Sequence, residues 1–332
     1  MFLRARSATG KHKAAIRHLT ELSRLRIEYP PRVADAVLLS CHGSISDLSD
    51  MPAFLLNIRR GRPVPKELLE EIAHRYETIG GSPLMEQSRL QASRLEERLG
   101  MPVRVAGRLW HPYPAAVLAE LVKLGATRVA SIPLAPQSVD VYHQAVREAA
   151  LGLADAHIEL VLPPSWGLEP KLLEAFLETV DEGLARLGEP VSPQRVGILL
   201  TAHSLPMRII QGGDRYEAQF RDMASAIAEP LSKRGHPVDI AFQSQGASAE
   251  PWLGPDLTNG FAGFVARGID TVLIAPIGFL AEHVETLFDL DIEAVGIAER
   301  AGVKRYARAR AVAARPKLID ALEAVARRAL QI

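Results

Sequence analysis

Residues 198–203 read ILLTAH, and residues 37–42 read VLLSCH. Each stretch is a short apolar run that ends in a hydroxyl residue, a small residue and a histidine, which is typical of a buried strand followed by a turn. Ligands of open α/β sheets bind beyond the carboxyl ends of the strands. The two stretches therefore predict that His42 and His203 point into one cleft between two similar lobes.

Apolar runs alternate with amphipathic stretches along most of the chain. The expected strands, which are short and rich in β-branched residues, are 37–40, 103–106, 128–133, 158–162, 196–201, 238–242 and 271–275. The expected helices include 66–76, 86–99, 169–186, 216–233 and 316–330. This alternation favours βαβ units, in which helices cover both faces of a parallel sheet. The sequence therefore predicts an α/β fold with parallel sheets flanked by helices.

A repeated spacing supports a division into two half-domains. Gly125 lies eight residues before Pro133, and Gly268 lies eight residues before Pro276, and each pair brackets an apolar run. Residues 188–193, GEPVSP, are the best linker candidate, because paired prolines disfavour a continuing helix. The predicted units are a basic N-terminal extension, an N-terminal lobe and a C-terminal lobe that ends in a helix, over residues 1–34, 35–189 and 190–332.

Composition narrows the classes of protein that the chain can represent. The 332 residues contain 39 basic and 39 acidic side chains, and this balance disfavours a global electrostatic grip on nucleic acid. The single cysteine, Cys41, cannot form an internal disulfide, a four-cysteine zinc site or an iron–sulfur cluster. No run of about 18 apolar residues occurs, so we expect no integral membrane segment.

The first thirty residues differ in composition from the rest. They hold seven Lys or Arg side chains against two Glu, and apolar side chains recur every third position from Ile16 to Leu25. An appended helix or a frayed tail explains this pattern most simply. A basic amphipathic helix that rests on an anionic membrane, or a targeting segment, is the alternative.

His203 stands in the segment 201–206, TAHSLP, directly after an expected strand. An imidazole in this place can accept a proton near neutral pH or bind a metal ion through a neutral nitrogen. Pro206 would stiffen the turn that holds it. The alternative is a histidine that only satisfies local backbone groups.

A run of acidic residues follows the last expected strand, in the segment 282–293, EHVETLFDLDIE. In a helix, Glu285, Asp289 and Glu293 are spaced four residues apart and share one face. Like charges at this spacing repel each other by roughly a few tenths of a kcal/mol per pair. The stripe is therefore either a solvated face or a place that collects cations. On the same helix, His283 would point elsewhere and have a structural role.

Two further groups have side chains suited to binding. Arg59, Arg60 and Arg62 lie near a predicted turn, where guanidinium groups can recognise carboxylate or phosphate, although a plain basic surface loop has the same composition. Trp252, in the segment 251–255, PWLGP, indicates either a rigid aromatic wall or ordinary core packing. Nothing in the sequence matches a phosphate-binding loop with lysine, a Rossmann glycine fingerprint or a zinc-protease helix motif.

In their order along the chain, these motifs resemble those of the ferrochelatase family. The resemblance covers nearly the whole chain from residue 37 onward and runs through the segments 75–84 (RYETIGGSPL), 201–206, 243–255 and 278–289. The segments 58–62 (IRRGR) and 134–136 (LAP) look most like the bacterial coproporphyrin III ferrochelatases. The resemblance implies two Rossmann-like lobes, with parallel sheets flanked by helices and a porphyrin cleft between them.

The resemblance also implies roles for individual residues. The catalytic pair on the metal-entry side of the ring would be His203 and Glu285. Asp289 and Glu293, with Arg75, would form an outer metal site that feeds iron toward Glu285 and could take Mg²⁺. The residues that would contact the porphyrin are His42, Ile58, Arg59, Arg60, Ser82, Ser244 and Trp252. His42 departs from the coproporphyrin branch, which has Tyr at this position on the opposite side of the ring.

The implied activity is that of a lyase that inserts Fe²⁺ into a porphyrin, most readily coproporphyrin III, in haem biosynthesis. Iron would be a substrate, with no tightly bound cofactor and no iron–sulfur cluster. The expected partners are the porphyrin and the haem product, with no nucleic acid. The expected state is a monomer in the cytoplasm, peripheral to the membrane at most.

Three alternatives stay open. A protoporphyrin IX ferrochelatase would bind two propionates instead of four. A non-catalytic haem- or porphyrin-binding protein on the same fold would use His42 and His203 as axial ligands, although it would have no need of Glu285. A chelatase for another metal, such as cobalt, would have similar ligands, because ligand type alone does not select Fe²⁺.

Overall fold

The computed structural model describes residues 34–153, 157–188, 192–246 and 249–332. The basic pattern of residues 1–33 lies outside this part of the chain, and so do residues 189–191 of the expected linker. Most of each expected lobe falls within the described residues.

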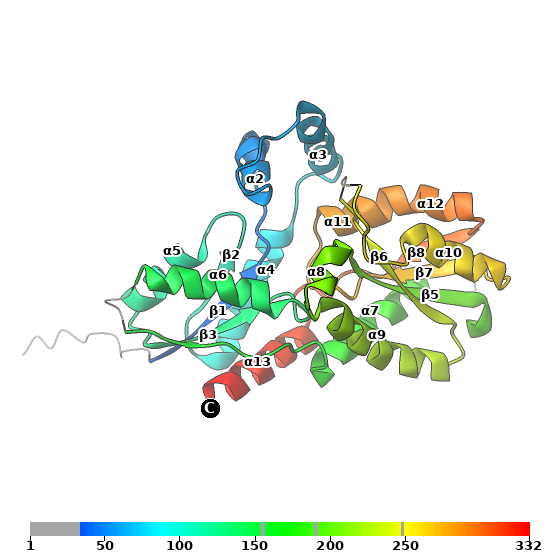
Figure 1. Cartoon of the computed structure of the whole chain (residues 1–332). Coiled ribbons are helices and arrows are strands. Elements are labelled where there is room, and N and C mark those ends of the chain that lie inside the picture. The colour runs from blue at the N-terminus through cyan, green and yellow to red at the C-terminus, as the bar shows by residue number, and fades with distance from the viewer. Residues whose placement is uncertain (1–33, 154–156, 189–191, 247–248) are drawn as a thin grey trace, which may run out of the picture.

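Two four-stranded parallel sheets form the centres of the two lobes (Figure 1). The first sheet has the order β2-β1-β3-β4, with bounds Val103–Gly107, Asp35–Cys41, Arg128–Pro133 and Glu159–Val161. The second has the order β6-β5-β7-β8, with bounds Val238–Gln243, Val196–His203, Thr271–Ala275 and Arg305–Arg308. β1 corresponds to β5 and β3 corresponds to β7, so the second sheet repeats the first. This repetition confirms the predicted α/β fold with two similar lobes.

The central strand of each sheet is buried because helices cover both faces. In β1, Val37 lies opposite Val103 of one neighbour and Ala130 of the other, and all three are buried. A continuous apolar run suits a parallel strand that is covered on both faces. Burial of each Val or Leu contributes roughly 1.5–3 kcal/mol, which fixes the strands and therefore the places where they end.

Helices connect the strands. Their bounds are α2 (Met51–Ile58), α3 (Lys66–Thr78), α4 (Leu84–Leu99), α5 (Pro114–Lys123), α6 (Val139–Leu151), α7 (Pro170–Arg186), α8 (Met207–Gln211), α9 (Tyr216–Lys233), α10 (Leu257–Ala266), α11 (Val284–Leu287), α12 (Ala294–Ala301) and α13 (Pro316–Leu330). A π-helical turn, Asp289–Glu293, lies between α11 and α12, and 3-10 turns occur at Leu48–Asp50 and Pro193–Arg195. α2 and α3 stand together, apart from both sheets (Figure 1).

The two lobes exchange one helix each. α7 precedes the second sheet and packs against β7, β8 and α9, whereas α13 follows that sheet and packs against α4 and β3 of the first lobe. Gly183 lets α7 approach closely, because a Cβ at this position would lie 2.7 Å from Cδ1 of Leu273 in β7. α7 and α13 also contact each other. The exchange joins the lobes through one hydrophobic core that contains buried residues of both sheets.

The expected strands all occur, and five helices begin and end close to their predicted bounds. The sequence does not predict β8, whose four residues read RYAR and are all partly exposed. A polar strand at the edge of a sheet lacks the apolar run on which the prediction depends.

Candidate active site

His203 and Glu285 form the centre of the candidate site. His203 is the last residue of β5, and its Nδ1 lies 2.9 Å from Oε2 of Glu285 in α11. The hydroxyl of Tyr216 donates to the backbone carbonyl of His203 at 2.7 Å, which fixes the end of the strand. The two side chains are 34% and 30% exposed, so a molecule from solvent can reach both.

The segment that carries Glu285 is bonded to the strand that carries His203. Gln243, at the end of β6, donates through Nε2 to the backbone carbonyl of Glu285 at 2.7 Å. Its Oε1 accepts a hydrogen bond from the hydroxyl of Thr201 in β5 at 2.8 Å. A buried amide with both ends satisfied keeps the neighbouring elements in one register.

His283 lies beside Glu285, so the expectation that it points elsewhere is wrong. Its Nε2 is 3.7 Å from Oε2 of Glu285, the same oxygen that Nδ1 of His203 contacts. The reason is that α11 has only four residues and begins after His283, which is its N-cap in extended conformation. A helix that continued through His283 would point this side chain away from Glu285, but His283 precedes the helix.

The charges of the central pair depend on each other. Desolvation disfavours the imidazolium of His203, but the charge and hydrogen bond of Glu285 and the charge of Asp289 outweigh it and raise the pKa of His203. Desolvation likewise disfavours the Glu285 carboxylate, but His203 and His283 outweigh it and hold the pKa of Glu285 well below its ordinary value. The pair can therefore hold one proton on His203 while Glu285 stays ionised.

Asp289 and Glu293 lie together with Arg75 in one cluster of ion pairs. Nη1 of Arg75 lies 3.0 Å from Asp289 and its Nη2 lies 3.0 Å from Glu293, so α3 of the first lobe bonds to the second lobe. The hydroxyl of Ser244 donates to the other carboxylate oxygen of Asp289. The two carboxylates are thus joined by one guanidinium in this structure.

Burial is the largest influence on Asp289 and raises its pKa to about 6. The charges of Glu285 and Glu293 act in the same direction, whereas Ser244 and Arg75 oppose them. The expected continuous helix through residues 282–293 is wrong, because the π-helical turn interrupts it. This turn leaves Asp289 buried and Glu293 largely exposed.

His42 directly follows β1, the strand that corresponds to β5, whose last residue is His203. Its Nδ1–H donates to the carbonyl of Gly43 at 3.1 Å, which leaves the lone pair of Nε2 free. Its side chain is solvent-accessible, yet desolvation by the surrounding protein is the main influence and lowers its pKa, aided by Arg108 and His283 and opposed by Glu285. His42 is therefore a neutral imidazole whose pKa also depends on the charge of Glu285.

The remaining expected porphyrin residues occupy several elements. The hydroxyl of Ser82, directly before α4, is buried without a hydrogen-bond partner among the described residues. Nε of Arg59 donates to the carbonyl of Pro63 in its own turn, whereas Ile58 and Arg60 are exposed. These side chains remain available to a ligand, and no contact within the described part of the chain joins them to the His203 pair.

Trp252 lies next to the loop of His203. Its backbone forms an antiparallel bridge with Pro206, and its ring covers Gly246 so closely that a Cβ there would lie 2.8 Å from the indole. The ring is half-buried. Trp252 can therefore act as a rigid wall beside the site.

Sequence reasoning missed Arg108 and Tyr142. The Arg108 guanidinium lies over the Tyr142 ring at 5.6 Å, and its Nε is buried without a hydrogen-bond partner among the described residues. Burial is the main influence that raises the pKa of Tyr142 to about 12. Arg108 follows the last residue of β2, as His42 follows β1, so the rule that sites form at strand ends could have found it.

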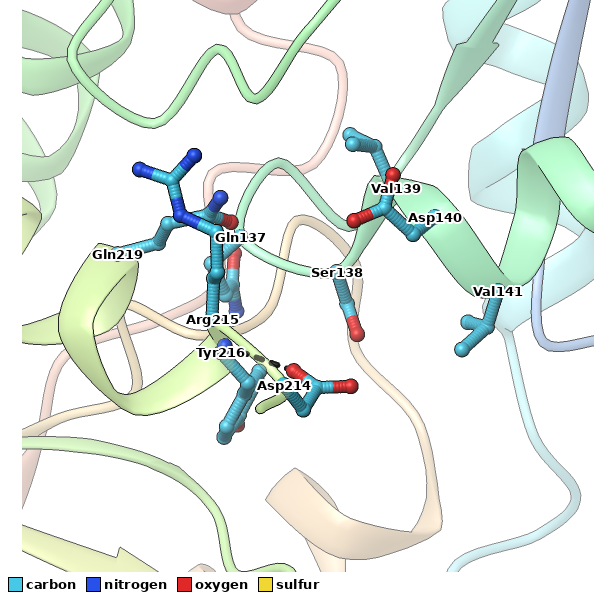
Figure 2. Close-up of a pocket in the computed structure, with 9 residues that line it drawn as sticks. All are labelled: Gln137, Ser138, Val139, Asp140, Val141, Asp214, Arg215, Tyr216 and Gln219. Carbon is cyan, nitrogen blue, oxygen red and sulfur yellow. Dashed lines mark hydrogen bonds between the residues drawn. The ribbon is translucent and has the colours of Figure 1, made fainter. Parts of the chain in front are cut away.

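A small pocket lies where the start of α6 meets the start of α9 (Figure 2). Within it the backbone N–H of Tyr216 donates to Asp214 at 2.8 Å. The amide of Gln137, which also lines the pocket, donates to the carbonyl of Gly278 outside it at 2.9 Å. The cavity measures about 10 Å³, which is room for about one water molecule. It is a feature of the contact between the lobes and cannot hold a tetrapyrrole.

Two features are absent from the described residues. No helix there combines the length and the hydropathy that a membrane span requires. No three or more His, Cys, Asp or Glu side chains of the described part form a group that could hold a metal ion. The His203–Glu285 pair therefore offers two ligands rather than a closed metal cage.

Two chelatases are among the solved structures with a similar fold. SirB from Bacillus subtilis, solved with Fe³⁺, matches with a TM-score of 0.55 at 15% identity and covers 89% of this chain and 95% of SirB. CbiX, described as the terminal enzyme for biosynthesis of sirohaem in denitrifying bacteria, has a TM-score of 0.51 at 13% identity and covers 88% and 97%. The two repeated parallel sheets flanked by helices therefore have the chelatase-type α/β fold.

The chain belongs to the ferrochelatase family, a family of lyases, because the profile described as Ferrochelatase matches residues 34–330. The Ferrochelatase of Acidobacterium capsulatum is 34% identical over 289 residues, which are 81% of this chain and 86% of the relative. The Ferrochelatase of Deinococcus radiodurans is 35% identical and covers 80% and 87%. The Coproporphyrin III ferrochelatase of Geobacillus kaustophilus is 34% identical and covers 87% and 94%.

Proposed function

We propose that this protein inserts Fe²⁺ into a porphyrin, with coproporphyrin III as the preferred substrate. The observation that carries the proposal is the 2.9 Å contact between Nδ1 of His203 and Oε2 of Glu285 at the carboxyl end of β5, in a chain of the ferrochelatase family. Iron is a substrate in this proposal, and the haem product must leave the same cleft. The proposal retains the expectation of a cytoplasmic monomer.

Insertion requires that two pyrrole N–H protons leave the ring and that the ferrous ion loses its water. Glu285 accepts the Nδ1–H of His203, so Nε2 of the neutral imidazole is free to take a pyrrole proton. The raised pKa of His203 makes it a stronger base than an ordinary histidine. The two protons that leave the ring pass through His203 to solvent as the metal enters.

Glu285 suits transfer of the ferrous ion, because its low pKa keeps it ionised and a carboxylate oxygen is a hard ligand. Asp289 and Glu293 would pass iron toward it from the outside, or hold Mg²⁺, after Arg75 releases them. Both carboxylates face the positive charge of Arg75. A metal cation that took the place of this guanidinium would restore the same attraction.

The other side of the ring would face His42, whose Nε2 lone pair can meet the iron of the product. Ser244 and Trp252 would line the edge, and Ser82 would offer its unpartnered hydroxyl to a propionate. A cleft with rigid walls binds a bent porphyrin better than a flat one, which lowers the barrier to insertion.

The choice of coproporphyrin III rests on charge. This porphyrin has four propionates and protoporphyrin IX has two, and the chain offers exposed Arg60 and Arg62 beside Arg59 in the turn that ends α2. Guanidinium groups bind carboxylates through paired hydrogen bonds. Relatives at 33–34% identity, from Geobacillus kaustophilus and Bacillus subtilis, are named coproporphyrin III ferrochelatases.

The test is anaerobic mixing of the purified protein with Fe²⁺ and, separately, coproporphyrin III or protoporphyrin IX, followed by the absorbance change on metal insertion. His203→Ala and Glu285→Ala should abolish turnover, whereas the exposed controls His157→Ala and Glu299→Ala should not. Turnover only with protoporphyrin would keep the chemistry and correct the substrate. Binding of both porphyrins without insertion would overturn the enzyme and favour a haem-binding protein that uses His42 and His203.

A further inference from the structure

Arg308, the last residue of β8, is a buried charge whose side chain is only 6% exposed. Its Nη1 lies 2.9 Å and 3.0 Å from the two carboxylate oxygens of Glu282. Its Nε and Nη2 each lie 2.7 Å from one oxygen of Asp291, in a two-pronged pair. One guanidinium therefore binds two carboxylates that are nine residues apart in the chain.

The two carboxylates bracket the segment that carries Glu285. Glu282 precedes Glu285 by three residues and Asp291 follows it by six. Glu282 also accepts hydrogen bonds from the backbone N–H of Ala311 at 2.9 Å and from the hydroxyl of Thr286 at 2.7 Å. Both ends of the segment are thus anchored to the end of β8.

The first lobe holds the same end of the segment. The backbone N–H of Glu282 donates to Oε1 of Gln87 in α4 at 2.9 Å. Glu282 is therefore bonded through its backbone to one lobe and through its side chain to the other. Its position depends on the contact between the lobes as well as on β8.

The segment needs such anchors because its own helical structure is short. α11 has four residues and the π-helical turn has five. A single helical turn forms few internal hydrogen bonds and does not hold its shape by itself. Gln243 bonds the backbone of Glu285 in the middle of the segment, and anchors at both ends restrict the remaining freedom of its carboxylate relative to His203.

We propose that Arg308 is a positioning residue that sets the separation between His203 and Glu285 for metal insertion, an inference that rests on the proposed function. Arg308 does not touch the reacting atoms. It acts through Glu282 and Asp291, and the planar fork of a guanidinium is what allows it to serve both. Lysine keeps the charge but cannot make these bonds together.

The test compares Arg308→Lys with Arg310→Lys, an exposed arginine two residues further on. Arg308→Lys should lower kcat for iron insertion about 10- to 100-fold, the usual cost of losing a group that orients a metal ligand. The KM for the porphyrin should stay within about twofold, because the ring walls are unchanged, and porphyrin fluorescence titration should confirm unchanged binding. Arg310→Lys should match the unaltered chain in all three.

A crystal structure of Arg308→Lys separates this inference from the proposed function. The expected result is a His203 Nδ1 to Glu285 Oε2 distance clearly longer than the 2.9 Å of the unaltered chain. If the unaltered chain inserts no metal into either porphyrin, the proposed function fails. The distance between His203 and Glu285 then tests by itself whether Arg308 positions Glu285. An unchanged distance together with unchanged kcat would overturn it.

If Arg308→Lys does not fold, Asp291→Asn replaces it, because Asp291 is 41% exposed and its loss leaves Arg308 paired with Glu282. The expected effect is in the same direction and smaller, with kcat lowered and the porphyrin KM unchanged. A folded Asp291→Asn protein with the kcat of the unaltered chain would count against the inference.

Discussion

Asp289→Asn should make the protein more stable at neutral pH while it impairs the site. Asp289 is buried between Glu285 and Glu293, and its ionised form is poorly solvated, so its pKa rises from the ordinary 3.8 to about 6. Asparagine has nearly the shape of the protonated carboxyl group and carries no charge. The substitution therefore removes a charge that the folded state tolerates badly.

The size of the effect follows from the shift in pKa. A folded-state pKa of about 6 against 3.8 means that the folded protein binds this proton more tightly than the unfolded chain. The contribution of Asp289 to the free energy of unfolding is consequently most favourable below about pH 4. It falls by roughly 3 kcal/mol as the pH rises through about 6, at 1.36 kcal/mol per pKa unit. The shift already includes the opposing charge of Arg75. Asparagine reproduces the hydrogen bonds of the protonated carboxyl group only in part, so we expect Asp289→Asn to add about 1–3 kcal/mol at pH 8.

The assay is urea unfolding of both proteins at pH 4.5 and pH 8, with the exposed Asp222→Asn as control. Asp289→Asn should gain stability at pH 8 and little or none at pH 4.5, and the control should change neither. Iron insertion at pH 8 should be slower, as is common where an active site holds a charge at a cost in stability. A loss of stability at pH 8, or a gain that is equal at both pH values, would refute the reasoning.

Three further outcomes are expected. His42→Tyr should speed steady-state turnover relative to single-turnover insertion, because a phenol without the free Nε2 of His42 holds the product iron less firmly; equal ratios in the two proteins would count against this. Glu285→Gln should move the rising limb of kcat/KM against pH to lower pH, because it removes the main opposing influence to desolvation and so lowers the pKa of His203; an unmoved limb would show that His203 does not act as the base. Gly183→Val should lower stability by about 1–3 kcal/mol in thermal unfolding, because its Cβ would meet Leu273 at 2.7 Å, and an unchanged Tm would contradict the packing.

The repetition of the two lobes could be predicted from the sequence because it depends on local patterns of apolar residues. The two stretches that end in His42 and His203 are apolar runs of similar length, and β1 and β5 take the same central place in their sheets. The rule that sites form beyond the carboxyl ends of strands then places both histidines without knowledge of the packing. The pairing of His203 with Glu285 is compatible with this rule but came from the resemblance.

The exchange of α7 and α13 could not be predicted in this way. Both helices have one apolar face, and periodicity shows that a face is buried but not against which sheet. The same holds for Arg308, since the sequence RYAR of β8 gives no apolar run and an arginine in a polar stretch is most often exposed. Its role depends on Glu282 and Asp291, which the chain brings to it only in the folded state.

The π-helical turn was missed for a related reason. A spacing of four residues places Glu285, Asp289 and Glu293 on one face only if the helix is regular. Adding residues to one turn costs hydrogen-bond geometry and is compensated by tertiary contacts, here those of Arg75 and Ser244 with Asp289. No local pattern in the sequence reports such contacts.

The two lobes resemble each other in architecture but differ in charge, and this difference gives the site its chemistry. The loop after β7 leads to Glu285 and Asp289. The loop after the corresponding strand β3 leads instead to the uncharged Gln137, which donates to Gly278 in the loop after β7. His203 has a carboxylate partner that raises its pKa, whereas burial lowers the pKa of His42, which has no such partner within hydrogen-bond distance among the described residues. A porphyrin between the lobes would thus meet a base that can be charged on one face and a neutral ligand on the other, which is the asymmetry that removal of protons and entry of a cation from one side require.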